Sequence, residues 1–140
     1  MQITVVLKGT AITLPIAAYE TVQGLIYRAI SGDPLYSSQV HNVGNTVNGR
    51  KFKLFTFSEL KGKYQINEKT ITYFTNVQFE IRSVDPYFIQ LLLAYFSIGR
   101  TLRLGDNDVE VLDVRLSDIT VFDNEITVRT SAPITVYYTE

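Results

Sequence analysis

Basic and aromatic side chains are concentrated in one segment that follows His41, the only histidine of the chain. They alternate there as Arg50, Lys51, Phe52, Lys53, Phe55, Phe57, Lys61, Lys63 and Tyr64, with Glu59 as the single acidic residue among them. Basic residues neutralise phosphates and aromatic rings stack on unpaired bases, so this composition suits single-stranded RNA. We therefore predict that Arg50, Lys51, Lys61 and Lys63 bind RNA. The same pattern is also typical of an amphipathic strand whose phenylalanines face the core and whose lysines face water.

Residue types that are rare or absent narrow the remaining chemistry. The chain has no cysteine, which excludes a thiol nucleophile, a disulfide framework and a zinc site built on thiolates. A single histidine excludes a metal cage of several imidazoles. The acidic residues near position 110 are typical of the outward face of strands and a turn, and they lack the further ligands of a calcium loop (Asp106, Asp108, Glu110 and Asp113). We predict neither a metal nor a cofactor.

Charge is unevenly distributed along the chain. The 140 residues carry a formal net charge of −1, and this total alone argues against nonspecific electrostatic binding of nucleic acid. Residues 1–70, however, contain eight basic and four acidic side chains, whereas residues 71–140 contain five and ten. The basic excess therefore lies in the half that contains the alternating basic and aromatic residues.

Length and composition predict one globular domain that does not associate with membranes. A hydrophobic fraction of 46% with 19% charged residues is typical of a folded chain, and 140 residues suffice for one core. The longest apolar stretch, residues 87–98, is shorter than the ~20 residues that cross a bilayer, and the first residues lack the basic start of a signal peptide. We therefore predict a cytoplasmic protein.

Two long segments and one short segment are predicted to be helices. Apolar residues of segment 17–30 recur as a stripe on one side of a helix, as expected for packing against a core. A second helix is marked by Asp85 as N-cap, Pro86 at the first helical position and Gly99 at the C′ position, and it is apolar on nearly every side. A short helix is expected to begin at Pro34.

Strands are predicted before, between and after the helices. The segments are 2–8, 52–57, 70–74, 77–82, 101–104, 109–116, 126–130 and 134–138. We expect 70–74 and 77–82 to pair as a hairpin, and 44–49, rich in Asn and Gly, to be a flexible loop. The order βαββαβ with extra hairpins predicts an α+β, ferredoxin-like fold with an antiparallel sheet and two helices on one face.

Three segments together resemble the CRISPR-associated endoribonucleases that cut repeat RNA into guide RNAs. The first is Leu14-Pro15, followed by Tyr19 and the helical residues Gln23-Gly24-Leu25-Ile26-Tyr27. The second is Val40-His41, which leads through a loop of Gly and Asn into Lys53-Leu54-Phe55-Thr56-Phe57-Ser58. The third is Thr130-Ser131-Ala132-Pro133-Ile134-Thr135-Val136, similar to a Ser-Pro-Ile strand of the family. Their order and spacing make the resemblance specific.

The resemblance implies a domain organisation. Members of this family, which belongs to the RAMP superfamily, consist of two ferredoxin-like domains in tandem, and a glycine-rich loop of the second domain helps to hold RNA. The similarity covers the whole chain but only the N-terminal half of such a protein. We therefore expect residues 1–140 to be a single ferredoxin-like domain that corresponds to the first of two and has weak or no activity alone.

The resemblance also implies catalytic residues. In family members of this kind, a tyrosine, a histidine and a lysine cleave RNA without a metal ion, and these positions correspond to Tyr27, His41 and Lys53. Lys51 is the alternative lysine, because the loop before it looks longer than usual. Attack of a ribose 2′-OH on the adjacent phosphate needs a base and an acid, which His41 and Tyr27 would supply in an order left open, while a lysine stabilises the phosphate charge. The products would be a 2′,3′-cyclic phosphate and a 5′-OH.

Two other functions are compatible with the same residues. A non-catalytic RNA-binding or assembly subunit of a CRISPR ribonucleoprotein would bind RNA without depending on His41. An interaction domain that forms a homodimer through its sheet edges would not bind RNA at all. The partner that we expect is CRISPR repeat RNA, with other CRISPR-associated subunits or a second copy of the chain as further partners.

Overall fold

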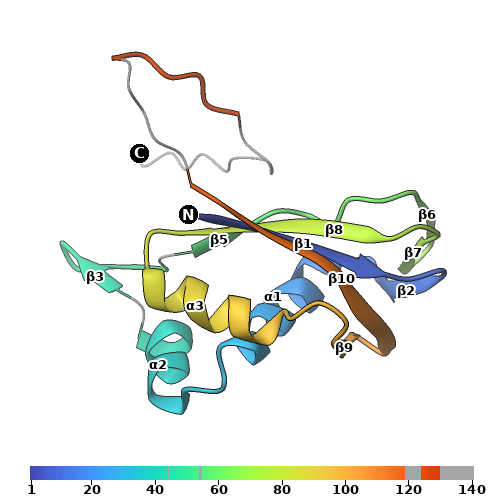
Figure 1. The fold of residues 1–140 in the computed structure, drawn as a ribbon, viewed down its shortest axis with the longest axis horizontal. Coiled ribbons are helices and arrows are strands. Elements are labelled where there is room, and N and C mark those ends of the chain that lie inside the picture. Colours follow the sequence, from blue (N-terminus) through green and yellow to red (C-terminus); the bar gives the residue numbers. More distant parts are fainter. Residues whose placement is uncertain (44, 54, 119–123, 130–140) are drawn as a thin grey trace.

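Five antiparallel strands form the main sheet of the computed structural model, which describes residues 1–43, 45–53, 55–118 and 124–129. In spatial order they are β5 (Phe55–Phe57), β8 (Val77–Ser83), β1 (Gln2–Lys8), β10 (Asn107–Ser117) and β9 (Thr101–Leu104). Without β9, the chain order is β1-α1-β5-β8-α3-β10, in which α1 is Ala18–Ala29 and α3 is Pro86–Tyr95. This arrangement confirms the predicted ferredoxin-like α+β fold (Figure 1).

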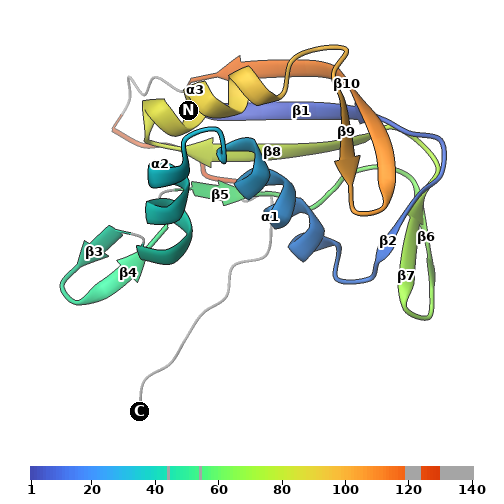
Figure 2. The ribbon, with the colours of Figure 1, turned by 90° about the horizontal axis from the view of Figure 1, so that it is seen from below.

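The helices lie on one face of this sheet (Figures 1 and 2). Helix α1 and helix α3 are the two predicted long helices, and each connects strands of the main sheet. The short helix that was expected from Pro34 is α2 (Pro34–Ser38), and it continues into a π-helical turn, η1 (Gln39–Val43). Both views place α2 beside α3. Among the described residues, no helix is long and apolar enough to cross a membrane.

The core lies between the helices and the sheet. Every second residue of β1 points into it, since Ile3, Val5 and Leu7 are completely buried. The apolar stripe predicted for the first helix is confirmed, because its members in α1 are buried (Val22, Leu25, Ile26 and Ala29). Helix α3 contributes Phe88 and Leu92 to the same core.

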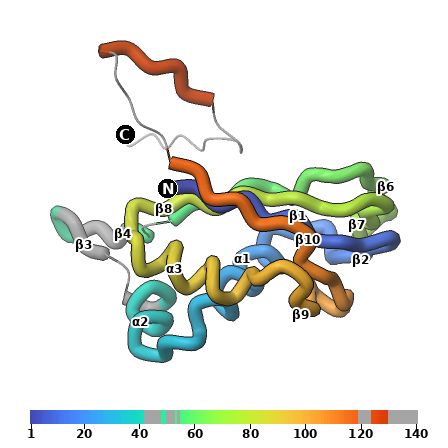
Figure 3. The backbone as a smooth tube through the Cα atoms, in the orientation of Figure 1, coloured from blue at the N-terminus to red at the C-terminus, as the bar shows by residue number. Residues whose placement is uncertain are grey.

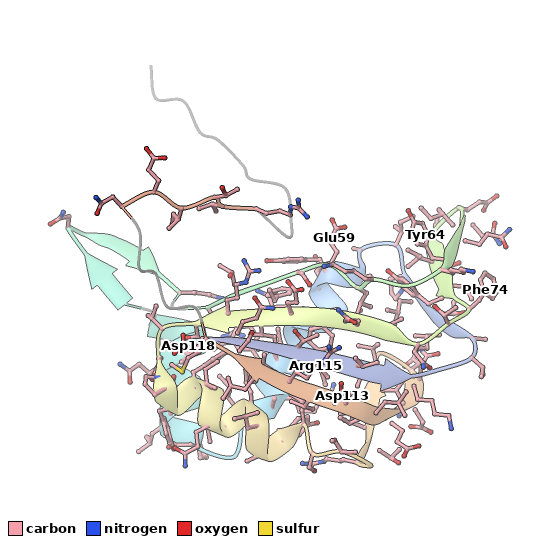
Figure 4. All side chains as sticks on the ribbon, turned by 45° about the horizontal axis from the view of Figure 1, so that its top comes forward. Glu59, Tyr64, Phe74, Asp113, Arg115 and Asp118 are labelled. Atoms are coloured by element: carbon pink, nitrogen blue, oxygen red, sulfur yellow. The ribbon has the colours of Figure 1, made fainter. Side chains whose placement is uncertain are left out.

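The opposite face of the main sheet carries polar side chains. On β8, Glu80 lies 3.6 Å from Lys61 Nζ and 3.5 Å from an Arg82 guanidinium nitrogen. Figure 4 shows Asp113 and Arg115 of β10 on this side, and their charged groups are 3.1 Å apart. The sheet is therefore covered by helices on one side and by hydrogen-bonding and charged groups on the other.

A second, smaller sheet corrects one predicted pairing. It contains β2 (Ile12–Pro15), β7 (Thr70–Tyr73) and β6 (Tyr64–Asn67), in that order. Segments 70–74 and 77–82 therefore do not pair with each other as predicted, because β7 lies in this small sheet and β8 in the main one. Pairing with β2 places Ile71 beside Leu14 and Tyr73 beside Ile12, so that four apolar side chains are buried together. Strand β6 was not predicted.

The expected flexible loop is a β-hairpin. Strands β3 (Asn45–Val47) and β4 (Arg50–Phe52) pair across Asn48 and Gly49. Both turn residues have positive φ values, 51° and 77°, and this geometry favours the Asn-Gly pair of a two-residue hairpin turn. The strand predicted over 52–57 is accordingly divided, since Phe52 ends β4 and Phe55 begins β5.

The end of α3 and the last described residues give two further corrections. Asp85 caps α3 as predicted, and its carboxylate accepts a hydrogen bond from the backbone N–H of Tyr87 at 3.0 Å. Gly99 is not the C′ residue, because the helix ends at Tyr95; the N–H of Gly99 instead donates to the carbonyl of Val111 at 2.8 Å. Residues 126–129 are not a strand, while Thr130 and the predicted strand 134–138 lie outside the described residues.

Candidate functional site

The structure brings Tyr27, His41 and Lys53 together at one corner of the molecule. Tyr27 lies in the last turns of α1, His41 lies in η1, and Lys53 lies between β4 and β5. Lys53 Nζ donates a hydrogen bond to the Tyr27 hydroxyl and is also 4.8 Å from the centre of the Tyr27 ring. The rings of Tyr27 and His41 are 4.5 Å apart between centroids, with their planes inclined by 58°.

The core holds the Tyr27 ring in place. Phe55 meets this ring edge to face, with 5.8 Å between centroids and an interplanar angle of 89°. Phe55 in turn stacks on Phe88 of α3 at 4.9 Å. Offset and edge-to-face aromatic pairs of this kind add ~1 kcal/mol each beyond the burial of their area. Sequence reasoning did not connect Phe88 with the site, because only the tertiary packing of α3 on β5 places it there.

The polar groups of the three residues are accessible from solvent. Tyr27 is half-buried, whereas His41 and Lys53 are exposed. An imidazole, a phenol and an ammonium group therefore meet at a surface that a large polar substrate can reach. Histidine and tyrosine can transfer protons, and a lysine can stabilise negative charge that develops on a phosphate.

A pocket of about 440 Å³ borders the site on the polar side of the sheet. Its lining includes Lys53 and a row of residues that the strand register aligns across four strands, Thr56 of β5, Arg82 of β8, Gln2 of β1 and Ser117 of β10. The Arg82 guanidinium donates to the Gln2 side-chain oxygen at 2.8 Å. Arg82 is thus a second cation near Lys53. Sequence reasoning missed it, because only the pairing of β5 with β8 brings the two segments together.

The four residues predicted to bind RNA are not gathered in one place. Arg50 and Lys51 lie on β4, whereas Lys61 forms a bridge with Gln78 near the other end of β8. Phe55, which follows β4, pairs with Ser83, five residues after Gln78 on β8, so about 17 Å of strand separates the start of β5 from Lys61. Lys63 immediately precedes β6 of the small sheet, which Figure 3 shows at the end of the molecule opposite α2.

The acidic residues near position 110 have basic neighbours. Asp108 lies 3.7 Å from the Arg103 guanidinium, and Asp113 lies 3.1 Å from that of Arg115. Within the described ranges, no three histidine or carboxylate side chains come close enough together to hold a metal ion. These acidic residues lie along β10 and the turn before it, as the sequence analysis expected.

Comparison with known proteins identifies similar solved structures. No protein-family model and no curated protein sequence matches the chain. A solved structure described as CRISPR associated protein Cas6 is 26% identical, with a TM-score of 0.60 over 86% of this chain and 49% of its own length. This chain is therefore similar to Cas6 and RAMP proteins. The resemblance found in the sequence is thereby confirmed.

Two further Cas6/RAMP-like structures have the same fold. One, described as an RAMP protein binding different RNA substrates, is 20% identical with a TM-score of 0.64, and the match covers 88% of this chain and 50% of that one. The other, a Cas6-related protein from Pyrococcus furiosus, is 18% identical with a TM-score of 0.60, and the match covers 89% and 50%. The chain therefore spans about half the length of the Cas6/RAMP-like structures that it matches.

Proposed function

We propose that the chain carries the active site of a metal-independent endoribonuclease that cleaves CRISPR repeat RNA into guide RNAs. The observation that carries this proposal is the convergence of Tyr27, His41 and Lys53 from three separate segments. A proton carrier, a phenol and a cation within contact distance are the groups that attack of a 2′-OH on the neighbouring phosphate requires.

Each residue has a role in this reaction. His41 and Tyr27 act as the general acid and base, one removing the proton of the 2′-OH and the other protonating the leaving 5′-oxygen. Lys53 stabilises the negative charge that develops on the phosphate oxygens. The oxygen of the 2′-OH forms a bond to phosphorus while the bond to the 5′-oxygen breaks. One fragment therefore ends in a 2′,3′-cyclic phosphate and the other begins with a 5′-OH.

Additional RNA contacts come from outside this group of three. Arg82 faces the pocket beside Lys53 and is placed to bind a phosphate or base next to the cleavage site. Arg50, Lys51, Lys61 and Lys63 would contact the RNA backbone further away. We also propose that residues 1–140 correspond to the first of two ferredoxin-like domains, because the solved relatives are about twice as long. The second domain would then add affinity for RNA.

The experiment is cleavage of end-labelled repeat RNA in EDTA, with wild type and His41→Ala compared. We expect at most slow cleavage by the wild-type domain alone, with a 2′,3′-cyclic phosphate at the new 3′ end, and in the extended protein a rate at least 10²-fold lower for the variant. RNA with a single 2′-deoxy nucleotide at the cleavage site is the matched control and should stay intact. The assay is repeated with a protein extended by a second domain, which we expect to act faster. Cleavage that is equal in wild type and His41→Ala, or that persists on the 2′-deoxy RNA, would refute the mechanism.

A non-catalytic RNA-binding subunit is the second candidate. It is favoured by the structural match to a RAMP protein described as binding different RNA substrates. In that case, RNA binding would be measurable at low salt, no cleavage would occur even with the extended protein, and His41→Ala would leave the dissociation constant unchanged. RNA binding with and without cleavage therefore separates the two candidates.

A further inference from the structure

The first turns of α2 and α3 are built in the same way. Each helix begins with an aspartate N-cap that is followed by a proline. Asp33 Oδ1 accepts a hydrogen bond from the backbone N–H of Tyr36 at 3.1 Å, and Asp85 Oδ1 accepts one from the backbone N–H of Tyr87 at 3.0 Å. In each case one carboxylate oxygen satisfies a free N–H group at the start of its own helix.

The same four residues also join the two helices to each other. The Tyr36 hydroxyl donates a hydrogen bond to Asp85 Oδ2, and the Tyr87 hydroxyl donates one to Asp33 Oδ2 at 2.5 Å. The two rings meet edge to face, with 4.8 Å between centroids and an interplanar angle of 80°. We call Asp33, Tyr36, Asp85 and Tyr87 the reciprocal cap, because each aspartate caps one helix and binds the tyrosine of the other.

The protonation states suit these bonds at neutral pH. Burial, together with the hydrogen bond to Asp85, raises the pKa of Tyr36 above the ordinary range of tyrosine. The hydrogen bond to Asp33 raises the pKa of Tyr87, and the same bond lowers the pKa of Asp33. Both tyrosines are therefore donors, and Asp33 is an ionised acceptor. Hydrogen bonds to a charged group are roughly twice as strong as neutral ones.

The position of His41 depends on α2, because the two lie in one continuous helical segment. Helix α2 has five residues and no fully buried side chain, and a helix of this length is not stable by itself. Tyr36 and Val40 are the partly buried residues that pack against the core in this segment. Helical backbone continues from α2 into η1, so a displacement of α2 also displaces His41 relative to Tyr27.

We propose that the reciprocal cap positions His41 against Tyr27 by fixing α2 to α3. Helix α3 is the stable partner, because its Phe88, Ile89 and Leu92 are buried in the core. The members of the cap are positioning residues and do not contact the RNA. The catalytic consequence rests on the proposed function, whereas the position of His41 can be measured without RNA.

The direct test is NMR spectroscopy of the 140-residue chain, in which a single histidine gives unambiguous ring signals. The variants Tyr36→Phe and Tyr87→Phe keep the rings and remove one bond between the helices each. We expect the His41 ring protons to lose part of the ring-current shift that Tyr27 causes. Backbone amides of residues 36–43 should exchange with solvent about tenfold faster in Tyr36→Phe, because a hydrogen bond to a charged group is lost.

Two further variants separate the effect of the contact between α2 and α3 from helix capping and from the loss of a tyrosine hydroxyl as such. Asp33→Asn keeps a carbonyl oxygen that can still cap α2, but it replaces the ionised oxygen that accepts the hydrogen bond from Tyr87 with a neutral amide group, which weakens the contact with α3. It therefore separates the contact between the helices from capping. Tyr95→Phe, at the other end of α3, is the matched control, because its ring packs on Arg100 and its hydroxyl makes no hydrogen bond within the described part of the chain.

The outcomes distinguish this proposal from the proposed function. Unchanged His41 shifts and exchange rates in Tyr36→Phe, Tyr87→Phe and Asp33→Asn would overturn the positioning role, whatever the RNA assay shows. If the cap acts as proposed, kcat for RNA cleavage falls about tenfold in Tyr36→Phe while KM stays the same. If cleavage proves independent of His41, the proposed function fails, and the NMR measurement still decides whether the cap places His41.

Discussion

The two ends of the main sheet carry lysines from one short stretch of sequence in different surroundings. At the end of β8 that finishes with Ser83, Lys53 contacts Tyr27 and shares a pocket with Arg82. At the opposite end, Lys61 lies 3.6 Å from Glu80, and the side chain of Tyr64 is 58% exposed. Figure 4 shows this separation, with Asp118 at the first end and Tyr64 at the second.

The difference shows that a basic segment of sequence need not form one basic surface. The ammonium group of Lys53 meets a phenol and lies near an imidazole, so it can act on a substrate phosphate. The charge of Lys61 is partly balanced by Glu80. A salt bridge near the surface contributes little to the stability of the fold. We therefore expect substitutions at the first end to affect the chemical step and substitutions at the second end to affect RNA binding only.

The largest effect is expected for Tyr27→Phe, which keeps the ring on Phe55 and removes the hydroxyl. If Tyr27 transfers a proton, kcat for cleavage should fall by about 10²- to 10⁴-fold while RNA affinity is unchanged. Single-turnover cleavage at saturating protein measures this. A rate within twofold of wild type would remove Tyr27 from the chemistry and leave it as a support for Lys53.

Lys53→Ala should have the next largest effect, with Lys51→Ala as its matched control. The loss of one group that stabilises developing phosphate charge costs about 10²- to 10³-fold in kcat. Lys51 lies two residues away on β4, and we expect its substitution to alter only the binding of RNA. A larger loss of kcat in Lys51→Ala than in Lys53→Ala would reverse the assignment.

At the far end of the sheet, Lys63→Ala should weaken RNA binding without changing kcat. The removal of one phosphate contact should lower the slope of log K against log salt by about 0.7 for a single strand. Lys61→Ala should change this slope less, because Glu80, which also pairs with Arg82, balances part of the Lys61 charge. Binding titrations at several salt concentrations test both variants. A kcat defect in either variant would contradict the separation of the two ends.

The smallest expected effect concerns the stability of the protein in alkali, and it tests the contact between α2 and α3 beside the candidate site. The folded protein holds the pKa of Tyr36 above the ordinary value of 10.0. The contribution of protonated Tyr36 to the free energy of unfolding is therefore fully present below pH 10, and it is lost as the pH rises further. The charged and titratable groups around Tyr36 are Asp85, Tyr87 and Asp33. We expect the free energy of unfolding, measured in urea between pH 8 and 11, to fall more steeply for wild type than for Tyr36→Phe. Parallel curves would show that Tyr36 ionises alike in both states.

The sequence predicts most of the elements of the fold but fewer of their pairings. Helix α3 is recognisable because Asp85 and Pro86 define its start by local geometry. The hairpin formed by β3 and β4 was missed, because residues 44–49 were predicted to be a flexible loop, although Asn48-Gly49 is a known turn pair. The pairing of β7 with β2 could not be predicted from the sequence. It joins Ile71 and Leu14 across 57 positions and depends on which apolar faces the other elements leave uncovered.

The contacts of the candidate site were also harder to predict from the sequence than its residues. Tyr27, His41 and Lys53 were predicted through the resemblance to a family, and the residue types alone do not require that they meet. Arg82 and the reciprocal cap were missed, because both arise from contacts between distant segments. The cap does have a local signal, the repeated Asp-Pro pair at residues 33–34 and 85–86, but this signal predicts two helix starts and not their contact.

The central position of β1 has a consequence for the order in which the chain can fold. Gln2 pairs with Arg82 on one side and with Ser117 on the other, so β1 has no partner in the main sheet until the chain has been synthesised beyond β8. Long-range pairing of this kind slows folding in comparison with a helical bundle of similar size. Until then, the side chains of Ile3, Val5 and Leu7 lack the core that buries them in the folded protein, and transiently exposed apolar surface of this kind is prone to aggregate.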